Sequence, residues 1–265
     1  MKIRIGTAGS PTGSNMTGIA AVEEAGLHAM EVQFGRGIQM GNGLAEKIGE
    51  ERKRHSVALS VHAPYYVNLL SEKAEASRKR IIDSCDRARR MGASPVVFHP
   101  GYYGKLSKER AYEEAKRQIA IILEHIKGWG VEIAPENTGK DSQFGTIEEV
   151  LGLAKELKTS FCIDIAHFRA KHRGKENLDE LFAVLPKKHI HFQYSGVEWN
   201  SGGEKRHMLI DKAHFTAFAR HILERKIDCT IICESPETFE DAQKMKKIFE
   251  DLGWEFGAKA SVKAN

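Results

Sequence analysis

Cysteine is scarce in this sequence, and long apolar runs are absent from it. The 265 residues include four cysteines, none of which forms a C-x-x-C pair. In a chain of this length four cysteines are weak evidence for disulfide bonds, so we expect a reduced, cytoplasmic setting. No apolar run approaches the ~20 residues that cross a bilayer. The opening stretch MKIRIGTAG lacks the apolar segment and cleavage site of a signal peptide, and we expect no membrane partner.

A strong charge imbalance is also missing. Lys and Arg total 40 against 36 Asp and Glu, which gives a formal net charge of +4. This mildly basic balance permits nucleic-acid binding without indicating it, because most of these charges fit solvated helix faces. No linker, internal repeat or low-complexity block divides the chain. We therefore predict one domain over residues 1–256, followed by a polar tail over residues 257–265.

Short β-branched runs alternate with longer amphipathic segments along the whole chain. The predicted strands are residues 2–6, 29–34, 57–63, 95–100, 131–137, 160–167, 189–194 and 229–235. Eight strands that are each followed by a helix predict a single-domain (β/α)8 TIM barrel, a fold that takes about 250 residues. A doubly wound open sheet is the competing architecture. It is disfavoured because no G-x-G-x-x-G motif follows the first strand.

One of the helices shows its boundaries in the sequence. Apolar side chains recur at helical spacing at Ala115, Ile119, Ile122 and Ile126. Ser107 is a suitable N-cap before them, and Gly128 or Gly130 is suited to end the helix. The pattern therefore predicts a helix between these two signals.

Ionisable side chains gather where the predicted strands end. In a TIM barrel the functional residues sit at the carboxyl ends of the strands and in the loops just after them. Here those positions hold His62, His99, Glu136, Asp164, His167, His191, His207 and Glu234. Each has an ordinary explanation alone, but charged groups are rarely buried unpaired, and no Arg or Lys occupies these strand ends. Imidazoles and carboxylates are ligands of zinc and manganese, so the pattern predicts a cluster of divalent cations.

The motifs that carry these residues resemble those of the endonuclease IV family. The matching stretches, in order over nearly the whole chain, are HAPYYVNL, FHPG, PENTG, CIDIAH, the strand-seven His191 and ESP. The resemblance implies a zinc-dependent endonuclease of DNA base excision repair. Such an enzyme hydrolyses the phosphodiester bond 5′ to an abasic site in double-stranded DNA, and leaves a 3′-hydroxyl and a 5′-deoxyribose phosphate.

The resemblance also implies how the ligands divide among two or three Zn2+ ions, with Mn2+ or Fe2+ as alternatives. His62 and His99 would hold the first ion, and the catalytic Glu136 would bridge it to the second. The other ligands would be Asp164, His191 and Glu234 for the second ion, and His167 and His207 for the third. The family's Asp-x-His pair in the seventh loop is replaced by Glu204-Lys205-Arg206-His207. Lys205 cannot ligate while charged, so either Glu204 serves or the third ion is weakly bound, altered or absent.

The same rim offers residues suited to DNA. Arg36 and Gln39 resemble the family's minor-groove loop, and Tyr65 matches a tyrosine that reaches the DNA at the lesion. A basic stretch beyond the sixth strand, with Arg169, Lys171 and Arg173, suits phosphate contacts, although a solvated charge run is the alternative. Because an abasic site has no base to read, recognition is expected to depend on DNA shape. We expect a monomer.

Two other functions stay open at this stage. A sugar isomerase or epimerase of similar barrel fold holds a single metal, and its ligand set resembles Glu136, Asp164, His191 and Glu234, with two glutamates as acid and base. A one-metal enzyme, however, has no need of His62 and His99. The remaining alternative is a damaged-DNA-binding module that has lost a metal, and the intact ligands of the first two sites argue against it.

Overall fold

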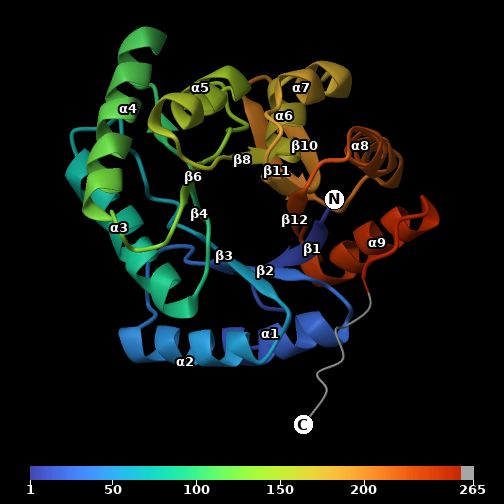
Figure 1. Cartoon of the computed structure of the whole chain (residues 1–265). Helices are drawn as coiled ribbons and strands as arrows, with labels where there is room; N and C mark the ends of the chain where they lie inside the picture. The colour runs from blue at the N-terminus through green and yellow to red at the C-terminus, as the bar shows by residue number, and fades with distance from the viewer. Residues whose placement is uncertain (258–265) are drawn as a thin grey trace.

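Eight parallel strands surround a central axis, and helices cover them on the outside (Figure 1). The structure is a computed structural model that describes residues 1–257. Most of the predicted polar tail, residues 258–265, lies outside the described residues. The barrel strands are β1 Ile3–Ala8, β2 Ala29–Gln33, β3 Ala58–His62, β4 Val96–Phe98, β6 Ile133–Pro135, β8 Cys162–Asp164, β9 Ile190–Tyr194 and β12 Cys229–Cys233.

The strands join in the order β6-β4-β3-β2-β1-β12-β9-β8. A parallel bridge between Glu136 and Cys162 connects the two end strands, so the sheet closes on itself. The Asn137 side chain supports this seam. Its oxygen accepts the Asp164 N–H at 2.7 Å, and its amide nitrogen donates to the Asp164 carbonyl at 2.9 Å. The predicted TIM barrel is therefore confirmed, and the open sheet is excluded.

The helices occupy the intervals between strands. Their bounds are α1 Asn15–Glu24, α2 Asn42–Lys53, α3 Ala74–Met91, α4 Lys108–His125, α5 Ile147–Leu157, α6 Ile165–Lys171, α7 Leu178–Val184, α8 Lys212–Arg225 and α9 Thr238–Asp251. The predicted cap of α4 is confirmed, because the Ser107 hydroxyl accepts the N–H of Arg110 at 3.3 Å. Within residues 1–257, no helix combines the length and the apolarity that crossing a membrane requires.

The sixth barrel strand is shorter than predicted. The sequence pattern extended it to His167, but β8 ends at Asp164 and α6 begins at the next residue. The cause is local, because the Asp164 carboxylate accepts the N–H of His167 at 2.7 Å and so caps the helix. As a result, His167 lies in the first turn of a helix rather than on a strand.

The two faces of the barrel strands differ in polarity. Phe98 and Ile231 belong to the large apolar core that includes the helices, whereas the separate cluster of Val97, Ala134 and Cys162 is small. Polar side chains are buried on the barrel strands as well, among them Glu31, Ser60, His191, Gln193 and Thr230. Since buried polar groups need partners, Glu31, Ser60, His191 and Gln193 form a hydrogen-bonded network below the candidate site.

Two small antiparallel strand pairs lie outside the barrel sheet. They are β5 Gly101–Tyr102 with β7 Gln143–Phe144, and β10 Gly196–Asn200 with β11 Gly203–Met208. Neither pair was predicted from the sequence. Lys140, just before β7, forms an antiparallel bridge with Gly203 of β11. Both follow the carboxyl ends of barrel strands, and β11 carries His207 toward the candidate site.

Candidate metal centre

Glu136 is the centre of the polar cluster at the strand ends. Its side chain is 0% exposed, and three imidazoles contact it. Nε2 of His62 lies at 3.2 Å, Nε2 of His99 at 3.0 Å and Nδ1 of His167 at 2.9 Å from its carboxylate oxygens. No Lys or Arg of residues 1–257 forms an ion pair with Glu136, so its charge depends on these imidazoles and on whatever else binds there.

The backbone sets the tautomers of three histidines. A carbonyl oxygen only accepts hydrogen bonds, so the ring nitrogen that faces it carries the proton. The three Nδ1–H donors and their acceptors are His62 to Ala63 at 2.7 Å, His167 to Asn137 at 2.9 Å and His207 to Glu234 at 3.1 Å. In its neutral form, the one that binds a metal, each ring then has its lone pair on Nε2. Histidines that bind metals have this arrangement, with the second nitrogen held by a backbone or carboxylate oxygen.

Two sets of side chains are spaced to hold cations. In each set three ligand atoms lie within 4.8 Å of one another, and the sets are His62, His99 and Glu136, and Asp164, His167 and His207. Oδ2 of Asp164 is buried and has no hydrogen-bond partner among the described residues. An unpaired buried carboxylate oxygen is costly, and a cation would satisfy it. Imidazole nitrogens and carboxylate oxygens suit zinc, manganese or iron(II).

Several carboxylates lie close together in this cluster. Burial raises the pKa of Glu234, and the neighbouring Asp164 and Glu136 carboxylates raise it further, well above its usual range. Burial also opposes the charge of Glu136, but the histidines, His99 first, hold its pKa well below the usual range. For His62, burial lowers the pKa, yet the hydrogen bond to Glu136 and its charge outweigh this and raise the pKa to about 9. A divalent cation would neutralise the excess carboxylate charge.

The seventh-loop sequence Glu204-Lys205-Arg206-His207 lies in β11 and contains a β-bulge. Arg206 pairs with Glu198 across the hairpin, and the pairing then skips Lys205 to continue at Glu204. Residues three apart in a regular strand face opposite sides, but the extra residue turns Glu204 to the same side as His207. The Glu204 carboxylate lies 3.4 Å from Nε2 of His167 and 3.7 Å from Nε2 of His207. Lys205 instead pairs with Glu198 at 2.6 Å.

His191 belongs to neither of the two sets. Its Nε2 lies 2.9 Å from Glu31 on β2, which also accepts from Ser60 and Gln193, both at 2.8 Å. Gln193 donates to Glu234 as well, at 3.0 Å. Sequence reasoning missed Glu31 and Gln193. Glu31 could have been found from the sequence, because a carboxylate within the apolar run AMEVQF is as unusual as a histidine at the end of a buried strand.

The residues expected to contact DNA fall into two groups. Arg36, Gln39 and Tyr65 are exposed, and the Tyr65 N–H donates to the Gly35 carbonyl at 2.9 Å, which ties the two loops together. The basic stretch is engaged within the protein. Its contacts are Arg169 to Glu176 at 2.9 Å, Arg173 to Asp141 at 2.6 Å, and Lys171 to the Gln143 carbonyl at 3.4 Å. Asp141 and Gln143 come from another segment of the chain, whereas Glu176 lies in the same stretch of the chain as Arg169.

A cavity of about 500 Å³ opens over the cluster. Its lining includes His62, His99, His167, Glu204, His207 and Glu234. Tyr65 and Tyr102, 59% and 41% exposed, also line it, together with Lys140. Exposed aromatic faces and a cation beside a polar floor suit a ligand that carries a sugar and a phosphate.

Fold and site together define a TIM barrel with a candidate metal centre at the carboxyl ends of its strands. The chain belongs to the xylose isomerase-like TIM barrel family, whose model matches residues 19–254. An uncharacterized protein of Methanocaldococcus jannaschii is 36% identical over 269 residues, which cover 93% of this chain and 97% of that protein. A Mycobacterium leprae protein named probable endonuclease 4 is 24% identical over 232 residues, 83% and 89% of the two chains. The resemblance to endonuclease IV is thereby confirmed.

Solved structures of two kinds share the fold. Endonuclease IV from Thermus thermophilus superposes with a TM-score of 0.67 at 20% identity, covering 94% of this chain and 99% of that one. A D-tagatose 3-epimerase-like protein gives a TM-score of 0.68 at 20% identity, with 95% and 96% covered. At these identities the likeness establishes the fold alone. The fold therefore does not separate a nuclease from an epimerase, and the side chains of the site must do so.

Proposed function

We propose that this protein is a metal-dependent endonuclease that hydrolyses the phosphodiester bond 5′ to abasic sites in double-stranded DNA. The products would be a 3′-hydroxyl and a 5′-deoxyribose phosphate. The observation that carries the proposal is the convergence of three imidazoles, from His62, His99 and His167, on the buried Glu136 carboxylate. A sugar enzyme with one metal has no use for this ring of imidazoles. The relative named probable endonuclease 4 supports the same reading.

The residues present fit two or three Zn2+ ions. In the proposed division His62, His99 and Glu136 would hold one ion, and Glu136, Asp164, His191 and Glu234 would hold the next. His167, His207 and Glu204 would hold the third. Glu31, bound to Nε2 of His191, leaves the other ring nitrogen of His191 for the metal and orients the ring. When bound, the cations supply Lewis-acid chemistry, polarising a phosphoryl oxygen and neutralising charge on the leaving oxygen.

The protein's own groups bind and orient the DNA. Tyr65 is exposed and lies 5.9 Å from His62 between ring centroids, and in the proposal it would contact the sugar at the lesion. Arg36, exposed in the loop tied to Tyr65, and Lys140, in the cavity lining, are the cations assigned to DNA phosphates. We prefer them to Arg169 and Arg173, because those two are already paired with Glu176 and Asp141.

Glu204→Gln is expected to weaken binding of the third ion by at least about 10-fold, since even the loss of a group that only orients a ligand costs that much. Lys205→Gln is the matched control. It changes the neighbouring charge, but Lys205 pairs with Glu198 outside the cluster, so metal affinity should not move. Zinc titration of both variants by calorimetry measures the difference. Equal affinities in the two variants would show that Glu204 is not a ligand.

A sugar epimerase is the second candidate, and one observation favours it. Glu136 and Glu234 lie in the same cluster as Asp164, as the mutual effect of these carboxylates on the pKa of Glu234 indicates, and such a pair suits acid and base roles at one metal. The solved epimerase-like structure has the same fold. This candidate leaves His99, His167, His207 and Glu204 without a role.

Incision of a labelled duplex that carries one abasic site tests the proposal. Protein whose zinc or manganese content has been measured is incubated with this duplex and with the same duplex without the lesion. We expect cleavage on the 5′ side of the lesion, a 3′-hydroxyl that a polymerase extends, and no cleavage of the intact duplex or by chelated protein. Ketose sugars are assayed in parallel for epimerisation. Epimerisation without incision by fully metal-loaded protein would replace the proposal with the second candidate.

A further inference from the structure

A second cavity lies at the opposite end of the barrel, at the amino ends of β1, β2 and β3. It has a volume of about 810 Å³. Residues from four segments line it: the start of β1, the residue before β2, the stretch from α2 to β3, and the stretch after α9. Ligand pockets for small molecules have volumes of roughly 300–1,000 Å³. The cavity is therefore large enough for a small molecule and is separate from the candidate metal centre.

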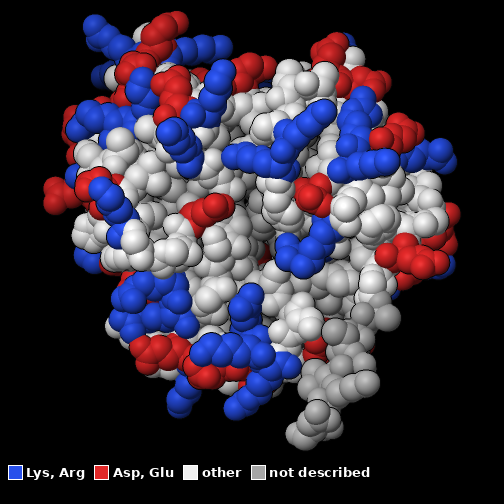
Figure 2. All heavy atoms as spheres, in the orientation of Figure 1, with Lys and Arg blue, Asp and Glu red and all other residues white. Residues whose placement is uncertain are grey.

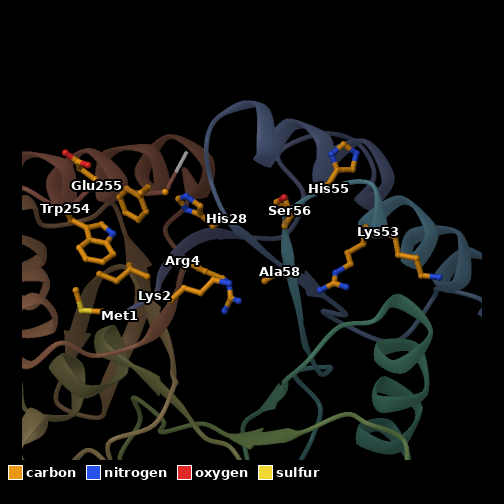
Figure 3. Close-up of a pocket in the computed structure, with 15 residues that line it drawn as sticks. Met1, Lys2, Arg4, His28, Lys53, His55, Ser56, Ala58, Trp254 and Glu255 are labelled. Carbon is orange, nitrogen blue, oxygen red and sulfur yellow. The ribbon is translucent and has the colours of Figure 1, made fainter. Parts of the chain in front are cut away.

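Unpaired cations face this cavity. Lys2, Arg4 and Arg52 all line it, and no carboxylate among residues 1–257 forms an ion pair with their side chains. Nε of Arg52 is buried without a hydrogen-bond partner in the described chain. Figure 3 shows Lys2 and Arg4 extending side by side into the middle of the cavity. Figure 2 shows several Lys and Arg side chains around the central hollow of that view, beside which Figure 1 marks the N-terminus.

The positive charges at this cavity repel one another. Burial lowers the pKa of Arg4, and the charge of Arg52 lowers it further. Burial, with the charges of Lys246 and Arg4, lowers the pKa of His28 to about 4. Other cations at the rim are satisfied, since Lys53 pairs with Glu50 at 2.7 Å and His55 with Glu23 at 2.7 Å. Half-buried guanidinium groups without counter-ions cost free energy unless an anion supplies the charge.

The other side of the cavity is aromatic. His28 stacks on Phe256 with ring centroids 4.7 Å apart, and Trp254 meets Phe256 edge-on at 6.4 Å. Nε1 of the Trp254 indole is buried without a partner in the described part of the chain. Glu255 is the acidic residue of this lining, and Figure 3 shows its carboxylate at the edge, away from Arg4. The cavity thus combines a basic half with an aromatic half.

We propose that this cavity binds a small phosphate ester that carries a planar ring, of the mononucleotide class. The guanidinium groups of Arg4 and Arg52 would bind the phosphate in the bidentate geometry that suits them, and Trp254, Phe256 and His28 would contact the ring. A duplex would contact the rim rather than Arg4, which lies half-buried at the second position of β1. The proposal does not depend on the activity of the metal centre.

Calorimetric titration of metal-loaded protein with AMP tests this site. Arg4→Gln and Arg52→Gln are each expected to weaken AMP binding by at least about 10-fold, as expected for the loss of a charged hydrogen bond. Lys53→Gln removes the same charge from the same rim, but from an already paired side chain, and should leave the affinity unchanged. Glu136→Gln should also leave it unchanged, because AMP held at the metal centre would respond to that variant instead. Adenosine should not bind, and inorganic phosphate should bind more weakly than AMP.

Three results would overturn the proposal. One is the absence of binding at millimolar AMP. Another is an equal loss of AMP affinity in the Lys53→Gln and Arg4→Gln proteins, which would indicate general charge attraction rather than a defined binding site. The third is an affinity for inorganic phosphate equal to that for AMP, which would show that the aromatic residues do not bind the ring. The melting temperature of the Arg4→Gln protein distinguishes a role of Arg4 in binding from a role in folding. Removal of an unpaired charge should not lower it in the Arg4→Gln protein, and a marked fall would assign Arg4 a structural role.

Discussion

Glu136→Gln is expected to reduce incision at abasic sites by at least about 100-fold. The substitution preserves size and one acceptor oxygen, but it removes the charge on which three imidazoles converge. Groups that only orient metal ligands contribute 10–100-fold, and a carboxylate shared by two ions should contribute more. Metal content should fall together with the rate, because an amide is a poor ligand for a second cation. Single-turnover incision and elemental analysis of the same samples measure the two effects.

Glu132→Gln is the matched control for this prediction. Glu132 immediately precedes β6, whereas Glu136 immediately follows it, so the two variants change the same charge at opposite ends of one strand. The control should retain wild-type incision and metal content. A Glu136→Gln protein that folds, binds metal and cuts at near-normal rate would remove the shared carboxylate from the mechanism.

The sequence allowed the barrel to be predicted because its signals are local. Each barrel strand is a short apolar run, and the alternation with amphipathic helices leaves few arrangements other than a closed barrel. The positions of His62, His99 and Glu136 followed from the same logic, since the carboxyl ends of parallel strands meet at one rim. The convergence of the His62 and His99 imidazoles on Glu136 is therefore a consequence of the barrel topology, which could be predicted from the sequence.

The parts that the sequence did not reveal depend on contacts between distant segments. The bulge at Lys205 is set by pairing of β11 with β10, so the side to which Glu204 turns could not be read from spacing alone. Asp141, the acidic partner of Arg173, is likewise brought in by folding. Glu31 was missed for another reason. It lies in the middle of a strand, and the search for function concentrated on strand ends.

Removal of metal ions from the proposed centre is expected to destabilise the protein, and increasingly so as the pH rises. The folded-state pKa of Glu234 is raised, so the metal-free protein loses stability as pH rises from the usual carboxyl pKa, near 4.3, to the raised value. The pKa of His62 is raised to about 9, so its stabilisation is complete below about pH 6.5 and is lost as pH approaches 9. Both shifts act in the same direction.

Metal-loaded protein should behave in the opposite way, because cations bind the deprotonated ligands and binding strengthens with pH. Between about pH 6 and pH 9 the His62 shift alone corresponds to roughly 3 kcal/mol, which is several degrees in melting temperature for a chain of this size. Calorimetric melting with zinc and with chelator at several pH values measures the gap. A chelated His62→Gln protein should lose part of the pH dependence. If the melting temperatures of zinc-loaded and chelated wild-type protein changed with pH in the same way, no cation would be compensating these carboxylates and imidazoles. That result would rule out the proposed metal centre.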